Sequence, residues 1–265
     1  MMKHLTTKLT WLSLALLLVT VSCDNNNNAE PPELPSEASM QADFSEMEQA
    51  QQSKFSSAAE SNFTTALAAT GIMKFILDVN LAIPKALVGA AKQYDPEEIA
   101  DGEWEWSFST QANQNEFAVR LTALTNGQSD VEWRFFVTSS AANPALENAL
   151  FFQGNTNFEA TSGTWTYFNP ASGDQVSTLE WNMDGDERTL VLEVTSDRND
   201  NLGDTIEYSF DGTVKTVVYT DVSENETTTI EFNTETKAGF IISPNYNNGE
   251  RACWDENLNN VSCSI

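Results

Sequence analysis

The chain has 265 residues, with 39 acidic and 13 basic side chains and a net charge of −26 at neutral pH. Such a surface repels nucleic-acid phosphates and anionic lipid headgroups, which excludes nucleic-acid binding as a function class. The single histidine, His4, lies close to the start of the chain, so the rest cannot form a Ser-His-Asp or Cys-His catalytic set or a histidine metal site.

Residues 1–22 have the pattern of an export signal. Lys3 and Lys8 precede an apolar run from Trp11 to Val21, which has the length of a signal-peptide core. A helix needs about 20 apolar residues to cross a hydrocarbon layer of about 30 Å, so the length disfavours a retained transmembrane anchor. Removal of Lys3 and Lys8 with the signal would leave the mature chain more negative still.

The segment Leu18-Val19-Thr20-Val21-Ser22-Cys23 resembles the lipobox of bacterial lipoproteins, in which a small residue precedes a cysteine that is lipidated and becomes the first residue of the mature protein. Ser22 and Cys23 fit this pattern, whereas Thr20 stands where the family usually has leucine. The resemblance covers residues 1–23 and implies acyl chains such as palmitate on Cys23. Two or three such chains would hold the protein to a membrane permanently, since each buried methylene contributes about 0.8 kcal/mol. The alternative is an ordinary secretory peptide cleaved elsewhere, with Cys23 free or paired.

Residues 23–43 predict a tether that follows the lipidated cysteine. The segment after Cys23 contains four consecutive asparagines, three prolines and five acids but no base, so it cannot bury enough apolar surface to fold. Such stretches resemble those of lipoproteins from the Bacteroidota and their relatives. This resemblance implies a location in the bacterial cell envelope, at the outer membrane.

Residues 44–95 predict a helical segment. Apolar side chains in residues 44–67 recur at three- and four-residue steps, which is typical of an amphipathic helix. Gly71 is expected to loosen or end this helix, and Pro84 should kink or stop a second, more apolar one. Charged residues within the second helix disfavour a membrane span. We therefore expect one or two amphipathic helices that pack on an apolar protein surface.

Residues 96–243 predict a β-meander. The apolar period changes here from 3.6 to 2, in about eleven short segments separated by turn signals such as Asn126-Gly127 and Asp211-Gly212. Strands that follow one another without helices form an antiparallel up-and-down sheet. Because open twisted sheets of more than about ten strands are uncommon, we expect a mainly β fold that forms a barrel or a curved half-barrel of about eleven strands.

Many of these segments place an acid between two large apolar residues, as in Trp104-Glu105-Trp106 and Leu179-Glu180-Trp181. Neighbouring side chains on a strand face opposite ways, so one face should be apolar and the other acidic and solvated. The apolar face either fills the interior or lines a cavity for an apolar ligand or lipid. The cavity candidates are the aromatic residues Trp104, Trp106, Trp133, Phe135, Trp165, Tyr167 and Trp181.

One loop carries oxygen-bearing side chains at spacings that calcium loops use, namely Asp197, Asn199, Asn201 and Asp204. Its glycine comes one place late, however, and Tyr208 stands where the bidentate glutamate of an EF-hand would be. A solvated hairpin loop is therefore favoured over a structural Ca²⁺ site, and no other cofactor is expected.

Residues 244–265 contain Cys253 and Cys263, which remain as a pair once Cys23 is assigned to lipid. A pair of cysteines in an oxidising compartment predicts a disulfide, here closing a short C-terminal loop. Two buried thiols are the alternative.

The sequence contains no phosphate loop, dinucleotide fingerprint or nucleophile elbow. We expect a non-enzymatic, lipid-anchored envelope protein whose partners are the membrane and a hydrophobic small molecule or lipid. Its plan, helices followed by a β-meander, is similar to that of the periplasmic carriers of acylated lipoproteins. The alternatives are a structural or adhesive surface lipoprotein with a packed core and a hydrolase that uses carboxylates alone.

Overall fold

Between residues 97 and 261, the described residues form strand after strand without an intervening α-helix. The computed structural model of the chain describes residues 30–53, 61–112, 115–127, 129–196 and 201–263. The chain divides into two units, Met1–Glu30 and Pro31–Ile265, and all helices and strands of the described residues belong to the second. The proposed export signal and Cys23 lie outside the described residues.

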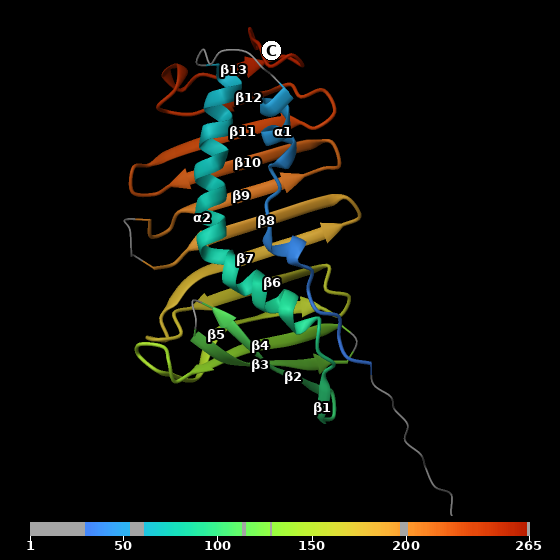
Figure 1. Cartoon of the computed structure of the whole chain (residues 1–265). Helices are drawn as coiled ribbons and strands as arrows, with labels where there is room; N and C mark the ends of the chain where they lie inside the picture. The colour runs from blue at the N-terminus through green and yellow to red at the C-terminus, as the bar shows by residue number, and fades with distance from the viewer. Residues whose placement is uncertain (1–29, 54–60, 113–114, 128, 197–200, 264–265) are drawn as a thin grey trace, which may run out of the picture. The chain divides into compact units, whose positions relative to one another are not determined.

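Each strand pairs antiparallel with the next, which gives one 14-stranded sheet in the order β1 to β14 (Figure 1). The expected antiparallel up-and-down architecture is therefore confirmed. The expected count of about eleven strands is too low, since the described residues hold fourteen. The bounds are β1 Glu97–Ala100, β2 Glu103–Ala112, β3 Asn115–Asn126, β4 Asp130–Ser139, β5 Leu146–Asn157, β6 Ser162–Phe168, β7 Gln175–Asp184, β8 Glu187–Val194, β9 Thr205–Phe210, β10 Val214–Asp221, β11 Glu226–Asn233, β12 Gly239–Ile242, β13 Ala252–Trp254 and β14 Asn260–Val261.

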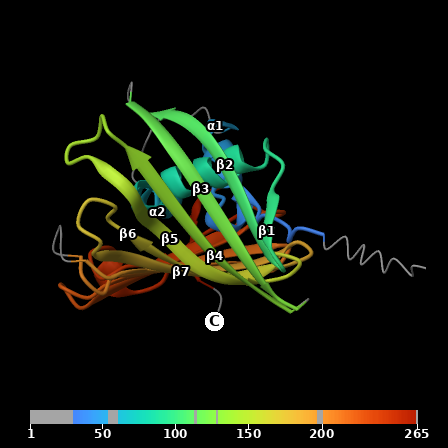
Figure 2. The ribbon, with the colours of Figure 1, turned by 90° about the horizontal axis from the view of Figure 1, so that it is seen from below.

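The sheet does not close into the expected barrel, because β1 pairs with β2 and β14 with β13, and these two strands do not pair with each other. The sheet instead bends around helix α2 (Asn62–Ala91), and β2 to β4 rise along one side of it (Figure 2). The helix covers the apolar face, so that face is buried without closure. The exposed edge strand β1 carries Glu97 and Glu98, and charge on an edge discourages pairing with another chain.

Alternation along the strands separates a buried concave face from a solvated convex face, as expected. In β4, Trp133 and Phe135 are fully buried, whereas Glu132 and Arg134 point to the other side. The aromatic rings pack across strands, with Phe152 stacked on Phe135 at a centroid distance of 4.6 Å. Burial of each such ring contributes about 2–3 kcal/mol, so this face supplies much of the stability of the sheet.

Helix α2 is a single helix, which corrects the expected break at Gly71. It begins at Ser61, whose side chain accepts a hydrogen bond from the Thr64 backbone N–H, while the Thr64 side chain accepts one from the Ser61 backbone in return. A glycine inside a helix costs only about 1 kcal/mol, which burial of the helix against the sheet outweighs. The helix bends just before Pro84, as expected, because the proline ring removes a backbone hydrogen bond and clashes with the preceding turn.

No single helix among the described residues is long and apolar enough to cross a membrane. The two arms of α2, Asn62–Asp78 and Ile83–Ala91, meet that criterion only when taken together, and they are bent by 57°.

The N-terminal segment from Pro31 to Asp43 packs on the sheet and does not form the disordered tether expected up to residue 43. It contains the 3-10 helix η1 (Glu37–Met40), which contacts β7 and α2. Met40 and Ala42 are 1% and 4% exposed. The prediction failed because it was based on the average composition of the segment, which is polar. The few apolar residues in it are enough to hold an extended segment on the apolar face of the sheet.

Lys215 on β10 is a buried cation that fastens the start of helix α1 (Ser45–Ser53) to the sheet. Its side chain is 5% exposed, and its ammonium donates hydrogen bonds to the Asp43 carbonyl at 2.8 Å, to Asp43 Oδ2 at 3.1 Å and to Glu46 Oε2. Phe44 packs edge-on against Tyr208 at a centroid distance of 5.7 Å. Polar and apolar contacts together therefore hold the segment that precedes α1.

The contribution of Asp43 to stability should be lost in acid. Burial alone would raise the pKa of Asp43, but hydrogen bonds from Ser45 and Lys215 outweigh burial and lower it. A carboxyl with a lowered folded-state pKa stabilises the fold above its unfolded pKa of about 3.9, and this stabilisation is lost as the pH falls through the folded-state pKa. Urea unfolding from neutral pH down to about pH 2 measures the effect. Asp43→Asn should show a weaker pH dependence than the wild type, and identical profiles would contradict this expectation.

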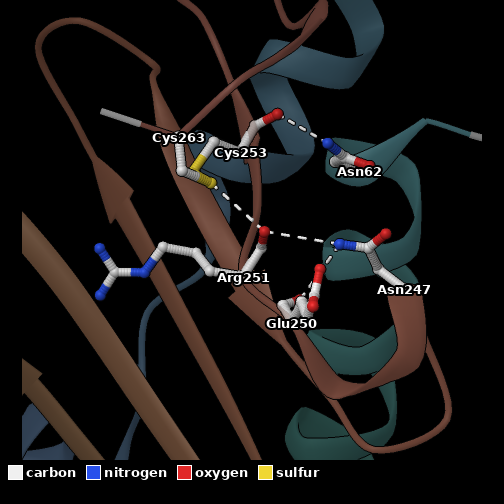
Figure 3. Close-up of a disulfide and its surroundings, with 6 residues drawn as sticks. All are labelled: Asn62, Asn247, Glu250, Arg251, Cys253 and Cys263. Carbon is white, nitrogen blue, oxygen red and sulfur yellow. Dashed lines mark hydrogen bonds between the residues drawn. A yellow bond between two sulfur atoms is a disulfide. The ribbon is translucent and has the colours of Figure 1, made fainter. Parts of the chain in front are cut away.

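Cys253 and Cys263 form the expected disulfide, with Cα atoms 5.3 Å apart (Figure 3). Strand β13, which carries Cys253, also holds the start of α2, because Asn62 Nδ2 donates to the Cys253 carbonyl at 2.7 Å. Asn62 Oδ1 accepts from the Tyr246 hydroxyl at 2.7 Å, and the Asn62 backbone N–H donates to Asn260 Oδ1 at 2.8 Å. The disulfide, the last two strands and the first turn of α2 thus form one cluster.

Reduction of this disulfide should lower the free energy of unfolding by roughly 2–3 kcal/mol, because the two cysteines are 10 positions apart in sequence. Hydrogen exchange should also accelerate in the first turn of α2. Urea unfolding with and without a reductant measures the first effect. The double variant Cys253→Ala/Cys263→Ala should match the reduced wild type and should not respond to reductant. Equal stability of this variant and the oxidised wild type would show that the bridge contributes nothing.

Candidate functional site

The seven aromatic residues expected to line a cavity all lie on the concave face of the sheet, each at most 7% exposed. Trp106 and Trp133 pack on each other at a centroid distance of 5.7 Å, and the rings of Phe135, Trp165 and Tyr167 each pack on Phe152. Among them, Tyr167 also lines a pocket between α2 and the sheet. The structure therefore places the set in the packed core, with Tyr167 at the point where the core opens.

A pocket of about 390 Å³ lies between the bend of α2 and strands β5 to β8. Its volume falls within the range of about 300–1,000 Å³ that is usual for small-molecule sites. The wall is formed by α2 on one side and by the strands and the loops that follow β6 and β8 on the other. Its residues are Phe75, Ile76, Asn80, Ile83, Pro84, Phe151, Tyr167, Phe168, Asn169, Pro170, Val176, Val194, Ser196 and Asn201.

Two interruptions of the strand pairing form the sheet side of this pocket. In β5, Phe152 pairs with Phe135 and Leu150 pairs with Phe136, which leaves Phe151 as an extra residue between them. In β7, the register with β6 likewise shifts at Val176. A bulge re-aims the side chain of the extra residue, and both Phe151 and Val176 line the pocket.

The bend of α2 forms the helix side. Pro84 is buried against the pocket, whereas Phe75 and Ile83 remain 67% and 60% exposed at its margin. Asn80 turns one end of its side chain back to the helix, since its Nδ2 donates to the Ile76 carbonyl at 2.8 Å. Large apolar side chains that stay exposed beside a pocket are a common feature of ligand sites.

The polar atoms of the wall are not all satisfied. The Tyr167 hydroxyl is buried and has no hydrogen-bond partner among the described residues, and neither has Asn201 Oδ1. Burial raises the pKa of the Tyr167 hydroxyl well above its usual range, so the group is uncharged at any physiological pH. A buried hydroxyl without a partner costs about 1–3 kcal/mol, so this part of the wall is not optimised for stability.

The residues expected to bind calcium do not all lie in the described part of the chain, because Asp197 and Asn199 fall outside it. Asn201 belongs to the pocket wall. Asp204 is 4% exposed and already accepts hydrogen bonds from the Tyr219 hydroxyl at 2.8 Å and the Val222 N–H at 2.9 Å. Burial and this bond to Asp204 raise the pKa of Tyr219. In the described residues Asp204 thus serves to close the hairpin between β8 and β9 onto β10.

The described residues contain no group of three or more His, Cys, Asp or Glu side chains placed to hold a metal ion. The glutamates of the repeated triplets, such as Glu180, lie on the convex face, away from the pocket. Comparison with protein-family models, with curated proteins and with solved structures finds no match to this chain.

Proposed function

We propose that this protein is a non-catalytic binding protein of the bacterial envelope, held to the outer membrane by lipid on Cys23, and that it binds an apolar or amphipathic small molecule between α2 and strands β5 to β8. The observation that supports the binding role is the coincidence of three local irregularities. The bend at Pro84 and the bulges at Phe151 and Val176 all border one pocket.

Each irregularity has a cost for the fold. A proline inside a helix destabilises it by about 3 kcal/mol, and a bulge forfeits regular pairing on both sides. Such costs are retained where the altered geometry serves a site. In this protein the three features come from α2, β5 and β7, and what they share is the pocket wall.

Binding of the uncharged apolar dye N-phenyl-1-naphthylamine tests this function. We expect saturable binding with an increase in dye fluorescence. Val176→Phe should weaken binding at least about tenfold, because the added ring atoms occupy the pocket. Val191→Phe is the matched control, since Val191 lies on the convex face of β8 and is 37% exposed. Absence of saturable binding to the wild type, or equal loss in both variants, would contradict the proposed site.

The anchor has its own test. In a bacterial host, labelled palmitate should enter the wild-type chain and not Cys23→Ser, and only the wild type should remain with the membranes after high-salt washing. Unchanged membrane association of Cys23→Ser would contradict the anchor and would leave the pocket unaffected.

A structural or adhesive surface role is the second candidate function. It is favoured by the tight burial of most of the aromatic set, including Trp133 and Phe135 at 0% exposure. In that case the pocket would take up no ligand, so the dye titration discriminates between the two functions.

A further inference from the structure

Helix α2 has a second apolar side, which faces away from the sheet. Phe75, Ile72 and Ile83 are 67%, 62% and 60% exposed, and they are the three most exposed large apolar side chains among the described residues. Ile72 and Phe75 are one turn apart on the first arm, and Ile83, about three turns beyond Ile72, continues the same side onto the second arm. These three residues form the outer face of α2. Exposed apolar residues gathered in this way mark an interaction surface.

Basic side chains line one flank of the outer face. Lys74, Lys85 and Lys92 follow one another at about three and two helical turns, so they lie in a row along the helix. Helix α2 and its C-cap Lys92 carry these lysines and a single acid, Asp78, whereas the whole chain has 39 acids and 13 bases. Lys74 also lies 3.6 Å from Glu48, in an exposed pair. An apolar face with lysines beside it is typical of helices that lie in a lipid interface.

The chain enters its folded unit beside the second arm of α2. The 3-10 helix η1 contacts α2, and a Cβ atom added at Gly89 would lie 2.8 Å from Glu37 Oε1. Seven residues separate Cys23 from Pro31, where the folded unit begins. This link spans at most about 30 Å when fully extended. Lipid on Cys23 would therefore keep α2 close to the bilayer, where even a weak contact becomes an intramolecular event.

We infer that α2 docks on the membrane that holds the acyl chains, with Ile72, Phe75 and Ile83 in the lipid interface and the flanking lysines at the headgroup phosphates. This inference rests on the proposed anchor and adds to it the orientation of the protein on the membrane. A second copy of the chain is a weaker occupant of the outer face, because each copy carries a net charge of −26. Since Phe75 and Ile83 also line the pocket, docking places the pocket margin at the lipid surface.

The test uses the full-length, lipidated protein in phosphatidylcholine vesicles. Ile72→Cys carries the environment-sensitive fluorophore NBD, and some of the lipids carry a nitroxide on an acyl chain, which quenches NBD at close range. With Cys23 acylated and Cys253 bridged to Cys263, the introduced thiol is the only free one. Ile72 is chosen because it does not line the pocket, so lipid bound there would not reach the label.

Val191→Cys, labelled in the same way, is the matched control, because Val191 lies on the convex face of β8. We expect quenching at position 72 to exceed that at position 191 at least about twofold. Adding Ile83→Asp should at least about halve the quenching at position 72, since a charge opposes entry into the lipid interface, whereas adding Val191→Asp should leave it unchanged.

Three results would overturn the inference. Quenching at position 72 that is no stronger than at position 191 would show that α2 does not meet the lipid, while the anchor and the pocket would stand. A blue shift of NBD at position 72 that grows with protein concentration in detergent solution, without vesicles, would assign the outer face to a second copy. If the wild type takes up no labelled palmitate in its host, the proposed anchor fails and the inference fails with it.

Discussion

Replacement of Gly154 by alanine should lower the free energy of unfolding by about 3 kcal/mol and the melting temperature by roughly 6–12 °C. Gly154 on β5 pairs with Trp133 on one side and with Trp165 on the other. A Cβ atom at this position would lie 1.9 Å from the Thr164 carbonyl oxygen and 2.7 Å from the Trp165 ring. The carbonyl belongs to the backbone of β6, so it can move only if β5 and β6 separate.

Gly71→Ala is the control for this experiment. A Cβ at Gly71 meets no atom within 4 Å, and the residue lies inside α2. Alanine should therefore stabilise the protein by about 0.5–1 kcal/mol. Urea and thermal unfolding of both variants measure the contrast. If Gly154→Ala were as stable as the wild type, the pairing of β5 with β6 would have to be different from that described.

Replacement of Lys215 by alanine should lower the free energy of unfolding by about 2–3 kcal/mol. Removal of one member of a fully buried ion pair costs about 3–5 kcal/mol, because the remaining charge is stranded. Here the side chains of Asp43 and Glu46 are 39% and 32% exposed and can regain water, which reduces the cost. Hydrogen exchange should also increase throughout α1, which Lys215 fastens to the sheet.

Lys74→Ala removes a comparable charge from an exposed pair. Lys74 lies 3.6 Å from Glu48, and the two side chains are 43% and 50% exposed. Exposed ion pairs contribute about 0–1 kcal/mol, so this variant should be close to the wild type in stability. Equal destabilisation by the two substitutions would show that burial of Lys215 has no special effect.

The strands were predictable because their pattern is local. Alternation of large apolar residues with glutamate, as in Trp104-Glu105-Trp106, determines which residues face the core whatever the neighbouring strands are. Strand β1, with its sequence EEIA and no buried residue, carries no such alternation. The sequence left a barrel and a curved half-barrel both open, because closure depends on whether another element covers the apolar face, and α2 does so here.

In the helical segment, a single glycine was a poor predictor of where a helix ends. Gly71 predicted a break, yet the helix continues through it, and the actual start is given by the capping box of Ser61 and Thr64. That motif was present in the sequence. The packed segment before α1 could not be inferred in the same way, because its few apolar residues gain stability only against a surface assembled from distant strands.

The pocket was not predictable from the sequence, although Tyr167 was among the candidates. Its wall depends on bulges at Phe151 and Val176, which are properties of the register between strands. One signal was available for the first of them, because Leu150-Phe151-Phe152 places three apolar residues in a row within an alternating strand. Asn201 also lines the pocket, and no pattern in its local sequence marks it as a wall residue.

A crystal structure of the protein with saturating N-phenyl-1-naphthylamine tests the proposed binding site most directly. We expect one bound dye molecule between Pro84 on α2 and the bulged residues Phe151 and Val176 of the sheet. A pocket that stays empty at saturation, or dye bound only on the convex face of the sheet, would contradict the proposed site.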